Sequence, residues 1–452
     1  MIPVVREVPY GPGPVEAYRR LRHLPHPVLL EGAADAADLG RWSYCSADPI
    51  DVLVLDAAHW PTHCARLRET LRQQSPTHAS PPFRGGWIGW LGYELGRAFD
   101  AQPTAPRDAF AATDGRLHLH DWVLAWDHLE RRCWICSTGI DRHGGADTDR
   151  AIRRAAMVRD LLANDPTPAP SGRTIGRPLH RTHERATYEA AVARVIEYVR
   201  AGDIFQANLS QRIVLETGDD PLGIYLDLRD RAPASHAALL EWPDLALVSA
   251  SPECFLRLDA ASGVVESRPV KGTRPRDADP PSDVALATQL STSAKDRAEN
   301  VMIVDLVRND LHRVADPASV AVPVLCRLDT HATVHHLVSI VTATLAPGHD
   351  ALDLLAATFP AGSITGAPKL RAMAILAELE PVARGAYCGA IGWIGLDGSM
   401  GLSVAIRTMA IHGSRVAVHA GGGITLLSDP ADEYQETLDK AAALLAALGA
   451  AP

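Results

Sequence analysis

The chain has 452 residues, 47% of them hydrophobic and 22% charged, and its formal net charge is −10. This length and composition are typical of a globular protein with a large core and two or three domains. The acidic balance argues against nucleic acid as a partner, because surfaces that follow phosphates carry a basic excess. No apolar run reaches the roughly 18 residues of a membrane span, and the first residues lack the layout of a signal peptide. We therefore expect no nucleic-acid or membrane partner.

The cysteines predict a reduced, cytoplasmic protein. Their number, seven, is odd, and their spacing does not form a disulfide framework. Cys133 and Cys136 form a single C-x-x-C within a run that is typical of a strand, so we do not expect a metal or redox site there. No cysteine lies in a G-x-C-x-G nucleophile elbow, and we therefore expect no glutaminase activity in this chain.

A composition break divides the chain. Residues 165–172 (DPTPAPSG) carry proline at alternate positions, which disfavours both a helix and a central strand. We predict an N-terminal part over residues 1–163, a proline-rich linker or loop over 164–182 and a C-terminal domain over 183–452. The alternative is a long surface loop within one interleaved unit.

Periodicity, caps and turn residues predict an α+β fold rather than a strict alternation of strand and helix. Two glycine-rich stretches, residues 85–94 and 389–395, suggest either strands with closely approaching backbones or a faint internal echo. The other predicted elements are a helix over residues 187–200, a strand over 204–215, a helix capped by Ser293, a meander of strands over 389–396, 402–411 and 415–419, and a helix that begins after Asp429 and Pro430.

Lys271 lies within residues 269–276 (PVKGTRPR), beside two arginines and two prolines. We expect a rigid, cationic turn in which the neighbouring positive charge lowers the pKa of the lysine. A lysine with a lowered pKa offers more free amine for nucleophilic attack on carbon. The alternative is a basic surface loop that meets a phosphate or no ligand at all.

Three glutamates on two predicted helices form a candidate metal site. Glu299 shares a helix face with the apolar residues three, four and seven positions further on. Glu433, Glu436 and Lys440 share a face of the last helix. Carboxylate oxygens held on rigid helices suit Mg²⁺. The alternatives are a buried pair between Glu299 and an arginine, and a solvated salt-bridge ladder on the last helix.

A glycine run, residues 420–424 (AGGGI), directly follows a predicted strand. Such glycines let backbone N–H groups converge on an anion, here a carboxylate rather than a phosphate, since the nucleotide-binding glycine patterns are missing. Arg407 on the adjacent strand could add a bidentate carboxylate contact. Taken alone, an arginine in this position more often forms a structural ion pair.

Together these motifs resemble the chorismate-utilising enzymes, which include anthranilate synthase component I, isochorismate and salicylate synthases, and aminodeoxychorismate synthase component I. The resemblance implies a sandwich like that of anthranilate synthase component I, with large antiparallel β-sheets flanked by helices, and makes residues 183–452 the chorismate-binding catalytic domain. The N-terminal part matches more loosely, through residues 85–94. The matching runs, in the family's order, are residues 251–253 (SPE), 269–273 (PVKGT), 294–300 (AKDRAEN), 334–339 (VHHLVS), 362–369 (GSITGAPK), 406–408 (IRT), 420–423 (AGGG) and 433–437 (EYQET).

Two positions select a branch of this family. Isochorismate and salicylate synthases carry a water-activating lysine where this chain has Gln206, and a glutamine is a poor general base. Anthranilate synthases typically have alanine at the position of Lys271, whereas aminodeoxychorismate synthases have the lysine. The resemblance is therefore greatest to the aminodeoxychorismate synthase branch. Anthranilate synthase component I is the alternative, and a non-catalytic subunit that senses chorismate or an amino acid is a remote one.

The resemblance also implies residue roles. Lys271 would attack C2 of chorismate as the nucleophile, Glu253 would protonate the departing C4 hydroxyl, and His336 would lie near that hydroxyl. Mg²⁺, which would position the ring carboxylate, would be held by Glu299, Glu433 and Glu436. The substrate's carboxylates and ether side chain would be held by Thr365, Tyr387, Arg407, Gly421, Gly422 and Lys440.

The resemblance further implies partners. Ammonia would come from a separate glutamine amidotransferase subunit in a heterodimer. The product, 4-amino-4-deoxychorismate, would serve 4-aminobenzoate and folate biosynthesis. One departure concerns regulation: family members inhibited by tryptophan carry LLES near the N-terminus, whereas this chain has LLEG at residues 29–32. Loss of that serine puts inhibitor binding in doubt, although a purely structural bound amino acid remains an alternative.

Overall fold

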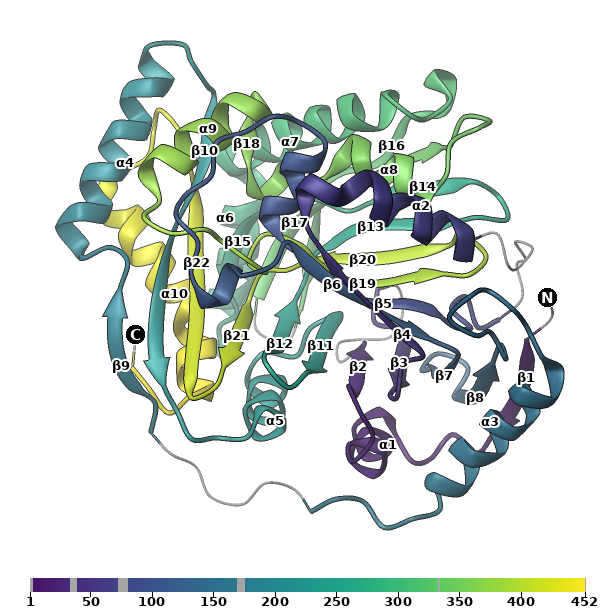
Figure 1. Ribbon diagram of the computed structural model, residues 1–452. Helices are drawn as coiled ribbons and strands as arrows, with labels where there is room; N and C mark the ends of the chain where they lie inside the picture. The colour runs from purple at the N-terminus through teal and green to yellow at the C-terminus, as the bar shows by residue number, and fades with distance from the viewer. Residues whose placement is uncertain (1–2, 33–38, 72–79, 169–174, 332–333, 452) are drawn as a thin grey trace.

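A computed structural model of the protein describes residues 3–32, 39–71, 80–168, 175–331 and 334–451 (Figure 1). Within these residues the strands form two large sheets of antiparallel pairs, and helices cover their outer faces. This architecture confirms the predicted α+β sandwich.

The larger sheet, sheet A, has twelve strands in the described part of the chain. Its strand order is β1 (Val4–Val8), β8 (Arg132–Ser137), β7 (Trp122–Asp127), β3 (Trp42–Ser46), β2 (Val28–Glu31), β11 (His236–Glu241), β12 (Ala246–Ser251), β21 (Thr408–His412), β22 (Arg415–Ile424), β10 (Gln206–Glu216) and β18 (Gly366–Ala367), with β9 (Arg177–Arg181) also paired to β10.

The second sheet, sheet B, has ten described strands. Its order is β15 (Val270–Pro275), β17 (Val334–Thr344), β14 (Val264–Ser267), β13 (Cys254–Asp259), β20 (Met400–Val404), β19 (Ala390–Gly395), β5 (Gly86–Leu91), β6 (Gly115–His120) and β4 (Asp51–Leu55), with β16 (Ala321–Thr330) also paired to β17.

Buried apolar side chains form a layered core. One cluster packs sheet B against α2 (Trp60–Leu71), α7 (Ala294–His312) and α8 (Ala351–Thr358). A second packs sheet A against α1 (Pro14–Leu21), α3 (Thr148–Leu161), α5 (Pro221–Arg231) and α10 (Pro430–Ala447). A third lies between the two sheets, and a fourth packs α4 (Arg185–Arg200) and α9 (Lys369–Leu379) on the end of β10.

The proline-rich segment does not separate two sheets. Strands from before and after it occur in both sheets A and B, as the interleaved alternative allows. The predicted linker, residues 164–182, contains β9, whereas residues 169–174 lie outside the described residues. The domain limits at residues 163 and 183 stay a prediction.

The two glycine-rich stretches are neighbours in space. Strand β5 pairs with β19, and Gly89 lies opposite Gly392. A Cβ at Gly89 would overlap the carbonyl oxygen of Arg116, and one at Gly392 would overlap that of Gly401. This confirms the interpretation that the backbones approach closely.

The predicted C-terminal meander is partly wrong. The single strand expected over residues 402–411 is two strands, because β20 ends at Val404 in sheet B and β21 begins at Thr408 in sheet A. The chain crosses between the sheets over residues 405–407, where Arg407 adopts a left-handed φ of 51°. The sequence does not reveal this crossing, because residues 402–411 have strand propensity throughout. What changes is the sheet with which the chain pairs.

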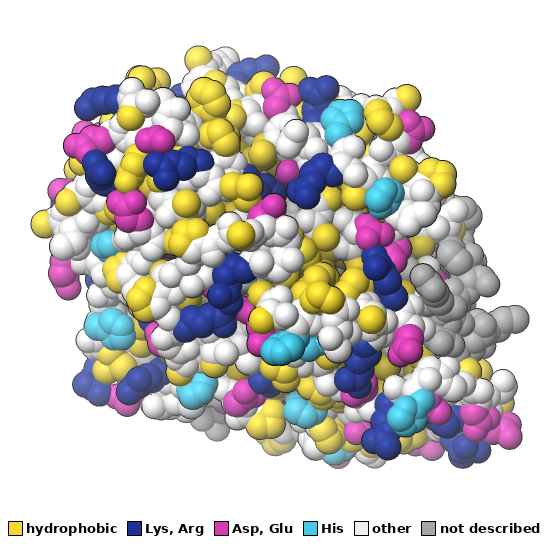
Figure 2. Space-filling view, turned by 45° about the horizontal axis from the view of Figure 1, so that its top comes forward, with side chains coloured by type: hydrophobic (Ala, Val, Ile, Leu, Met, Phe, Trp, Pro, Cys, Tyr) yellow, Lys and Arg dark blue, Asp and Glu magenta, His cyan; other side chains and the backbone are white. Residues whose placement is uncertain are grey.

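Two predicted helix caps are confirmed, whereas Thr187, predicted to cap the helix that ends at Arg200, lies inside α4, which begins at Arg185 after Glu184. The Ser293 hydroxyl accepts a hydrogen bond from the amide of Asp296 at the start of α7, and Asp429 caps α10 ahead of Pro430. None of the described helices is long and apolar enough to cross a membrane. On the face shown in Figure 2, basic side chains are interspersed with acidic ones and form no continuous basic surface.

Candidate active site

A cavity of about 510 Å³ lies where the two sheets diverge. Strands β15 and β17 of sheet B form one wall, β10 and β22 of sheet A form another, and the first turns of α7 and α10 contribute side chains. Most of the residues predicted to carry chemistry line this cavity, although they come from distant parts of the chain.

Lys271 enters the cavity from a strand rather than from the predicted turn. Strand β15 is bulged against β17, where Lys271 and Gly272 occupy the irregularity between Val270 and Thr273. Gly272 has a φ of 86°, and a Cβ there would press on Asp296. A β-bulge changes the direction in which nearby side chains point, and at this bulge Lys271 points into the cavity.

The cause predicted for the altered lysine pKa was also wrong. Burial lowers the pKa of Lys271, with Glu299 opposing this effect and the Lys440 ammonium adding to it. The two neighbouring arginines are engaged elsewhere, since Arg274 pairs with Asp296 and Arg276 with Asp283.

Glu253 lies between β12 and β13, lines the same cavity and is only 3% exposed. Burial raises the pKa of its carboxyl to about 7, against the opposing effects of the Ser363 hydrogen bond and of Lys271. The Ser363 hydroxyl donates a hydrogen bond of 2.6 Å to Glu253 Oε1. Glu253 can therefore hold a proton near neutral pH, as a general acid requires.

The three predicted metal ligands line the same cavity. Glu433 Oε1 accepts a hydrogen bond from Ser428, while its buried Oε2 has no partner among the described residues. Gly422 allows this approach, because a Cβ there would lie 2.9 Å from Glu433 Oε2 and 3.5 Å from Glu436 Oε1. Burial raises the pKa of Glu299 and of Glu433.

The acidic side chains that line the cavity do not form a preassembled metal-binding site. Within the described ranges, no group of three or more histidine, cysteine or acidic residues is arranged to hold a metal ion. Glu436 is instead paired with Lys440 at 2.5 Å, and this pairing holds its pKa low despite burial. Lys295 Nζ lies 4.0 Å from Glu433. The donor atoms fit a hard cation, but it would have to compete with these lysines.

Two cations face the cavity from sheet A and α10. Arg407 projects from the crossing between β20 and β21, and its guanidinium makes no hydrogen bond or ion pair with a described residue. Burial lowers the pKa of Arg407. Lys440 Nζ donates to the carbonyl oxygen of Gly421 at 2.9 Å, so this carbonyl anchors a lysine. Gly421 lines the cavity, whereas Gly422 faces the glutamates of α10.

Tyr387 is held by stacking and by a supported loop. Its ring stacks on His419, with centroids 4.9 Å apart and an interplanar angle of 7°. The loop before it is fixed by Glu94, whose carboxylate accepts hydrogen bonds from the amides of Arg384 and Gly385. The N-terminal motif thus supports a cavity residue almost 300 positions further along the chain.

His336 and Thr365 differ in how they relate to the cavity. His336 lines it from β17 and shares a 3.0 Å hydrogen bond with Thr273. Burial and the nearby Arg407 lower the pKa of His336 to about 3, so the imidazole is neutral. Thr365 is fully buried and its hydroxyl donates to the carbonyl oxygens of Ala361 and Gly362, and it does not line the cavity.

Among the cavity residues that were not assigned roles from the sequence are Ser363, Lys295 and His419. Ser363 and Lys295 lie within two of the matching runs, residues 362–369 and 294–300, so the sequence alone could have indicated them. His419 directly precedes the glycine run, and only the stacking on Tyr387 reveals its relation to the site.

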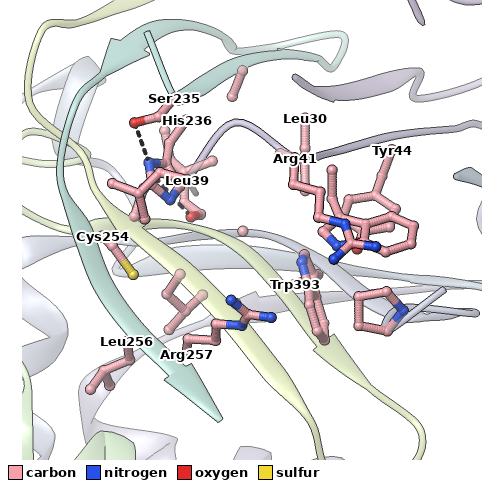
Figure 3. Close-up of a pocket in the computed structure, with 18 of the residues that line it drawn as sticks. Leu30, Leu39, Arg41, Tyr44, Ser235, His236, Cys254, Leu256, Arg257 and Trp393 are labelled. Atoms are coloured by element: carbon pink, nitrogen blue, oxygen red, sulfur yellow. Dashed lines mark hydrogen bonds between the residues drawn. The ribbon is translucent and has the colours of Figure 1, made fainter. Parts of the chain in front are cut away.

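A second cavity, of about 340 Å³, lies elsewhere between the sheets (Figure 3). It is lined from β2, β3 and β11 on one side and from β13, β19 and β20 on the other. Tyr44, Arg41, Arg257 and Trp393 surround it, and Ser235 contacts His236 at its edge. Glu31, of the LLEG run, lines this cavity, but its carboxylate accepts hydrogen bonds from Tyr225 and Arg229.

The sequence matches the family described as chorismate binding enzyme over residues 30–446. The chain therefore belongs to the chorismate binding enzymes and is an enzyme that acts on chorismate. It is 39% identical to aminodeoxychorismate synthase component 1 of Salmonella typhimurium, an alignment that covers 97% of this chain and 96% of that protein. It is 37% identical to anthranilate synthase component 1 of Streptomyces coelicolor, with 93% and 83% covered.

The fold is likewise similar to a solved member of the family. Anthranilate synthase component I from Streptococcus pneumoniae superposes with a TM-score of 0.75 at 28% identity, covering 98% of this chain and 92% of that one. The interleaved pair of sheets is therefore shared with a chorismate-utilising relative.

Proposed function

We propose that the chain is aminodeoxychorismate synthase component I, which converts chorismate and ammonia to 4-amino-4-deoxychorismate and water. One observation carries the proposal. Lys271 and Glu253 face one cavity with opposite changes in proton affinity, since burial lowers the pKa of the amine and raises that of the carboxyl to about 7. The site thus supplies a nucleophile and an acid together.

The reaction begins with attack of the neutral Lys271 amine on C2 of the chorismate ring. A C2–N bond forms, the two conjugated ring double bonds shift toward C4, and the C4–O bond breaks. The C4 hydroxyl leaves as water with the proton that Glu253 provides, while the attacking nitrogen gives up a proton. Ammonia then adds at C4, both double bonds shift back, and the C2–N bond breaks. The added nitrogen gives up a proton, and the departing Lys271 nitrogen takes one up and leaves as the free amine.

Glu253 suits the acid role because its proton is held by burial rather than by a carboxylate partner. Ser363 donates to Oε1 and the Val270 backbone also hydrogen-bonds this carboxyl, so both neighbours hold the acid in place for the departing hydroxyl. His336, neutral at physiological pH, can contact that hydroxyl without competing as a charged acid.

Chorismate carries two carboxylates and an enolpyruvyl ether, and the cavity has matching groups. Arg407 offers an unengaged guanidinium for one carboxylate. Lys440 and Gly421 lie nearby on α10 and β22, and the stacked Tyr387 ring gives the substrate a fixed wall. Thr365 serves by holding the loop that presents Ser363, since its own hydroxyl is bound to backbone.

We further propose that the site uses Mg²⁺. The unpartnered Glu433 Oε2, with Glu436 and Glu299 in the same cavity, fits an oxygen-binding cation. When bound, Mg²⁺ would hold the ring carboxylate and offset its charge. Two of the chain's lysines lie beside these carboxylates, with Lys440 paired to Glu436 and Lys295 near Glu433.

A glutamine amidotransferase subunit would deliver the ammonia. The name component 1, carried by the relatives of known function, fits a two-component enzyme. The seven free cysteines fit a reducing compartment, and we place the protein in the cytoplasm, where its product would enter 4-aminobenzoate and folate synthesis.

The test is product analysis by mass spectrometry after mixing the protein with chorismate, Mg²⁺ and ammonium chloride at mildly alkaline pH. A product in which amine replaces hydroxyl and the enolpyruvyl group is kept supports the proposal. Fluorescent anthranilate with pyruvate would overturn it in favour of anthranilate synthase, the function of the Streptomyces coelicolor relative.

A further inference from the structure

A buried glutamine beside Lys271 has an unsatisfied side chain. Gln206 is the first residue of β10 and is 1% exposed. Among the described residues, neither its Oε1 nor its Nε2 has a hydrogen-bond partner. Leaving both ends of a buried amide unsatisfied costs free energy. Such a group needs either a structural partner or a function.

The position of this amide relates it to Lys271. Strand β22 has a glycine, Gly423, next to Gln206, and a Cβ at that position would overlap Gln206 Nε2. The same Cβ would lie 3.3 Å from Lys271 Nζ. The carboxamide and the lysine amine therefore flank one small space, which the missing side chain of Gly423 leaves open.

We propose that Gln206 is a positioning residue for the Lys271 nucleophile. Because no other described group engages either end of the carboxamide, it can turn so that Oε1 accepts a hydrogen bond from Lys271 Nζ. That bond would fix the amine and direct its lone pair toward C2 of the ring. Gly423 is part of the same arrangement, since only glycine at this position leaves room for the Gln206 carboxamide.

An uncharged amide is suited to this task. A carboxylate in the same place would pair with the lysine and favour its ammonium form, which cannot attack carbon. An apolar side chain would leave the amine without orientation among the three staggered positions of its last bond. The amide accepts a hydrogen bond while adding no charge.

The inference rests on the proposed function, because it assigns a role toward the Lys271 adduct. The experiment is a single-turnover reaction with chorismate in the absence of ammonia, followed by intact-protein mass spectrometry to measure the rate at which the covalent adduct appears. Chorismate affinity is measured separately by equilibrium dialysis, and folding by thermal melting.

In Gln206→Leu we expect adduct formation to slow roughly 10- to 100-fold, the effect of misplacing a reacting group. Chorismate affinity should stay within about threefold of that of the unmodified protein. A general structural defect would weaken chorismate binding as well. Gly423→Ala should reproduce the slowing with Gln206 intact, because its Cβ displaces the carboxamide, and the nearest atoms that it meets belong to the side chains of Gln206 and Lys271.

The matched control is Gln211→Leu. Gln211 lies on the same strand, is 2% exposed and also has an unpartnered Oε1 among the described residues, but its Nε2 donates to Thr437. Its adduct rate should stay within about threefold of the unmodified protein. A folded Gln206→Leu protein with an unchanged adduct rate would overturn this inference alone. An unmodified protein that forms no adduct would overturn the proposed function and this inference together.

Discussion

The two cavities between the sheets differ less in size than in the state of their polar groups. In the second cavity, Glu31 is satisfied by Tyr225 and Arg229, Arg41 is paired with Asp127, and Arg257 is exposed to solvent. In the candidate active-site cavity, Arg407 is unpaired among the described residues and burial lowers the pKa of Lys271. Unsatisfied buried charge is destabilising and persists where a ligand or a reaction needs it. Empty volume alone therefore does not identify the reactive site.

The largest expected effect comes from removing the nucleophile. Lys271→Ala should reduce formation of 4-amino-4-deoxychorismate by about 10³-fold or more, because the covalent route is lost. Arg257→Ala, in the second cavity, should leave the rate within about threefold. Steady-state product assays on both variants test the contrast, and equal losses would remove the distinction between the cavities.

Removing the acid should have the next largest effect. Glu253→Gln should slow the reaction by roughly 10²- to 10⁴-fold. In the unmodified protein the reactive form is protonated, and the pKa of Glu253 is about 7. The rate of the step in which Glu253 donates this proton should therefore fall as pH rises above about 7. A pH profile of adduct formation checks this, and a Glu253→Gln protein that keeps the same descending limb would contradict it.

The proposed Mg²⁺ site gives an intermediate effect. Glu433→Gln replaces the carboxylate whose Oε2 is unpartnered, and activity at a fixed, limiting Mg²⁺ concentration should fall about 10- to 100-fold. Part of the loss should return at higher Mg²⁺, since the remaining carboxylates still bind. Independently, Mg²⁺ should raise the melting temperature of the unmodified protein more than that of the variant. Equal shifts in both proteins would speak against Glu433 as a ligand.

The smallest effect concerns stability, and here the two cavities should behave alike. Each has a neutral histidine, buried in the case of His336 and half-buried in the case of His236, since desolvation lowers the pKa of His336 to about 3 and that of His236 to about 4. An unfolded histidine has a pKa near 6.5. The unfolded chain therefore binds more protons below that pH, and stability falls as pH decreases from about 6.5 toward the folded values.

The loss at pH 5.5 should be about 1.4 kcal/mol for each histidine relative to neutral pH. Denaturant unfolding at pH 7.5 and 5.5 measures it. His236→Asn and His336→Asn should each reduce the difference between the two pH values by that amount. A variant whose pH dependence matches the unmodified protein would show that its histidine is protonated in the folded state.

Local signals in the sequence were sufficient for some elements. Ser293 and Asp429 marked helix starts because a cap needs only a few neighbouring residues. Lys271 and Arg407 were singled out from local residue patterns and Glu253 by resemblance, and the structure brings all three into one cavity. Thr365 was expected to touch substrate, but its hydroxyl is used within its own loop.

Signals that act over long distances were not available. Residues 402–411 have continuous strand propensity, yet the chain leaves sheet B after Val404 and enters sheet A at Thr408. The pairing partners that cause this crossing, such as β13 and β12, lie well over a hundred residues earlier. Likewise, the pKa of Lys271 is set by burial, which no turn composition encodes.

The sequence by itself determined the chemistry that is available: which side chains exist, their order, and the caps and glycines that shape single elements. Only the tertiary structure decided which of them meet. Interleaving of the two sheets places Lys271 of β15 beside the Gln206 amide of β10, across a gap that Gly423 leaves. Proximity and desolvation arise from packing between distant segments, and these two effects turn ordinary side chains into a reactive site.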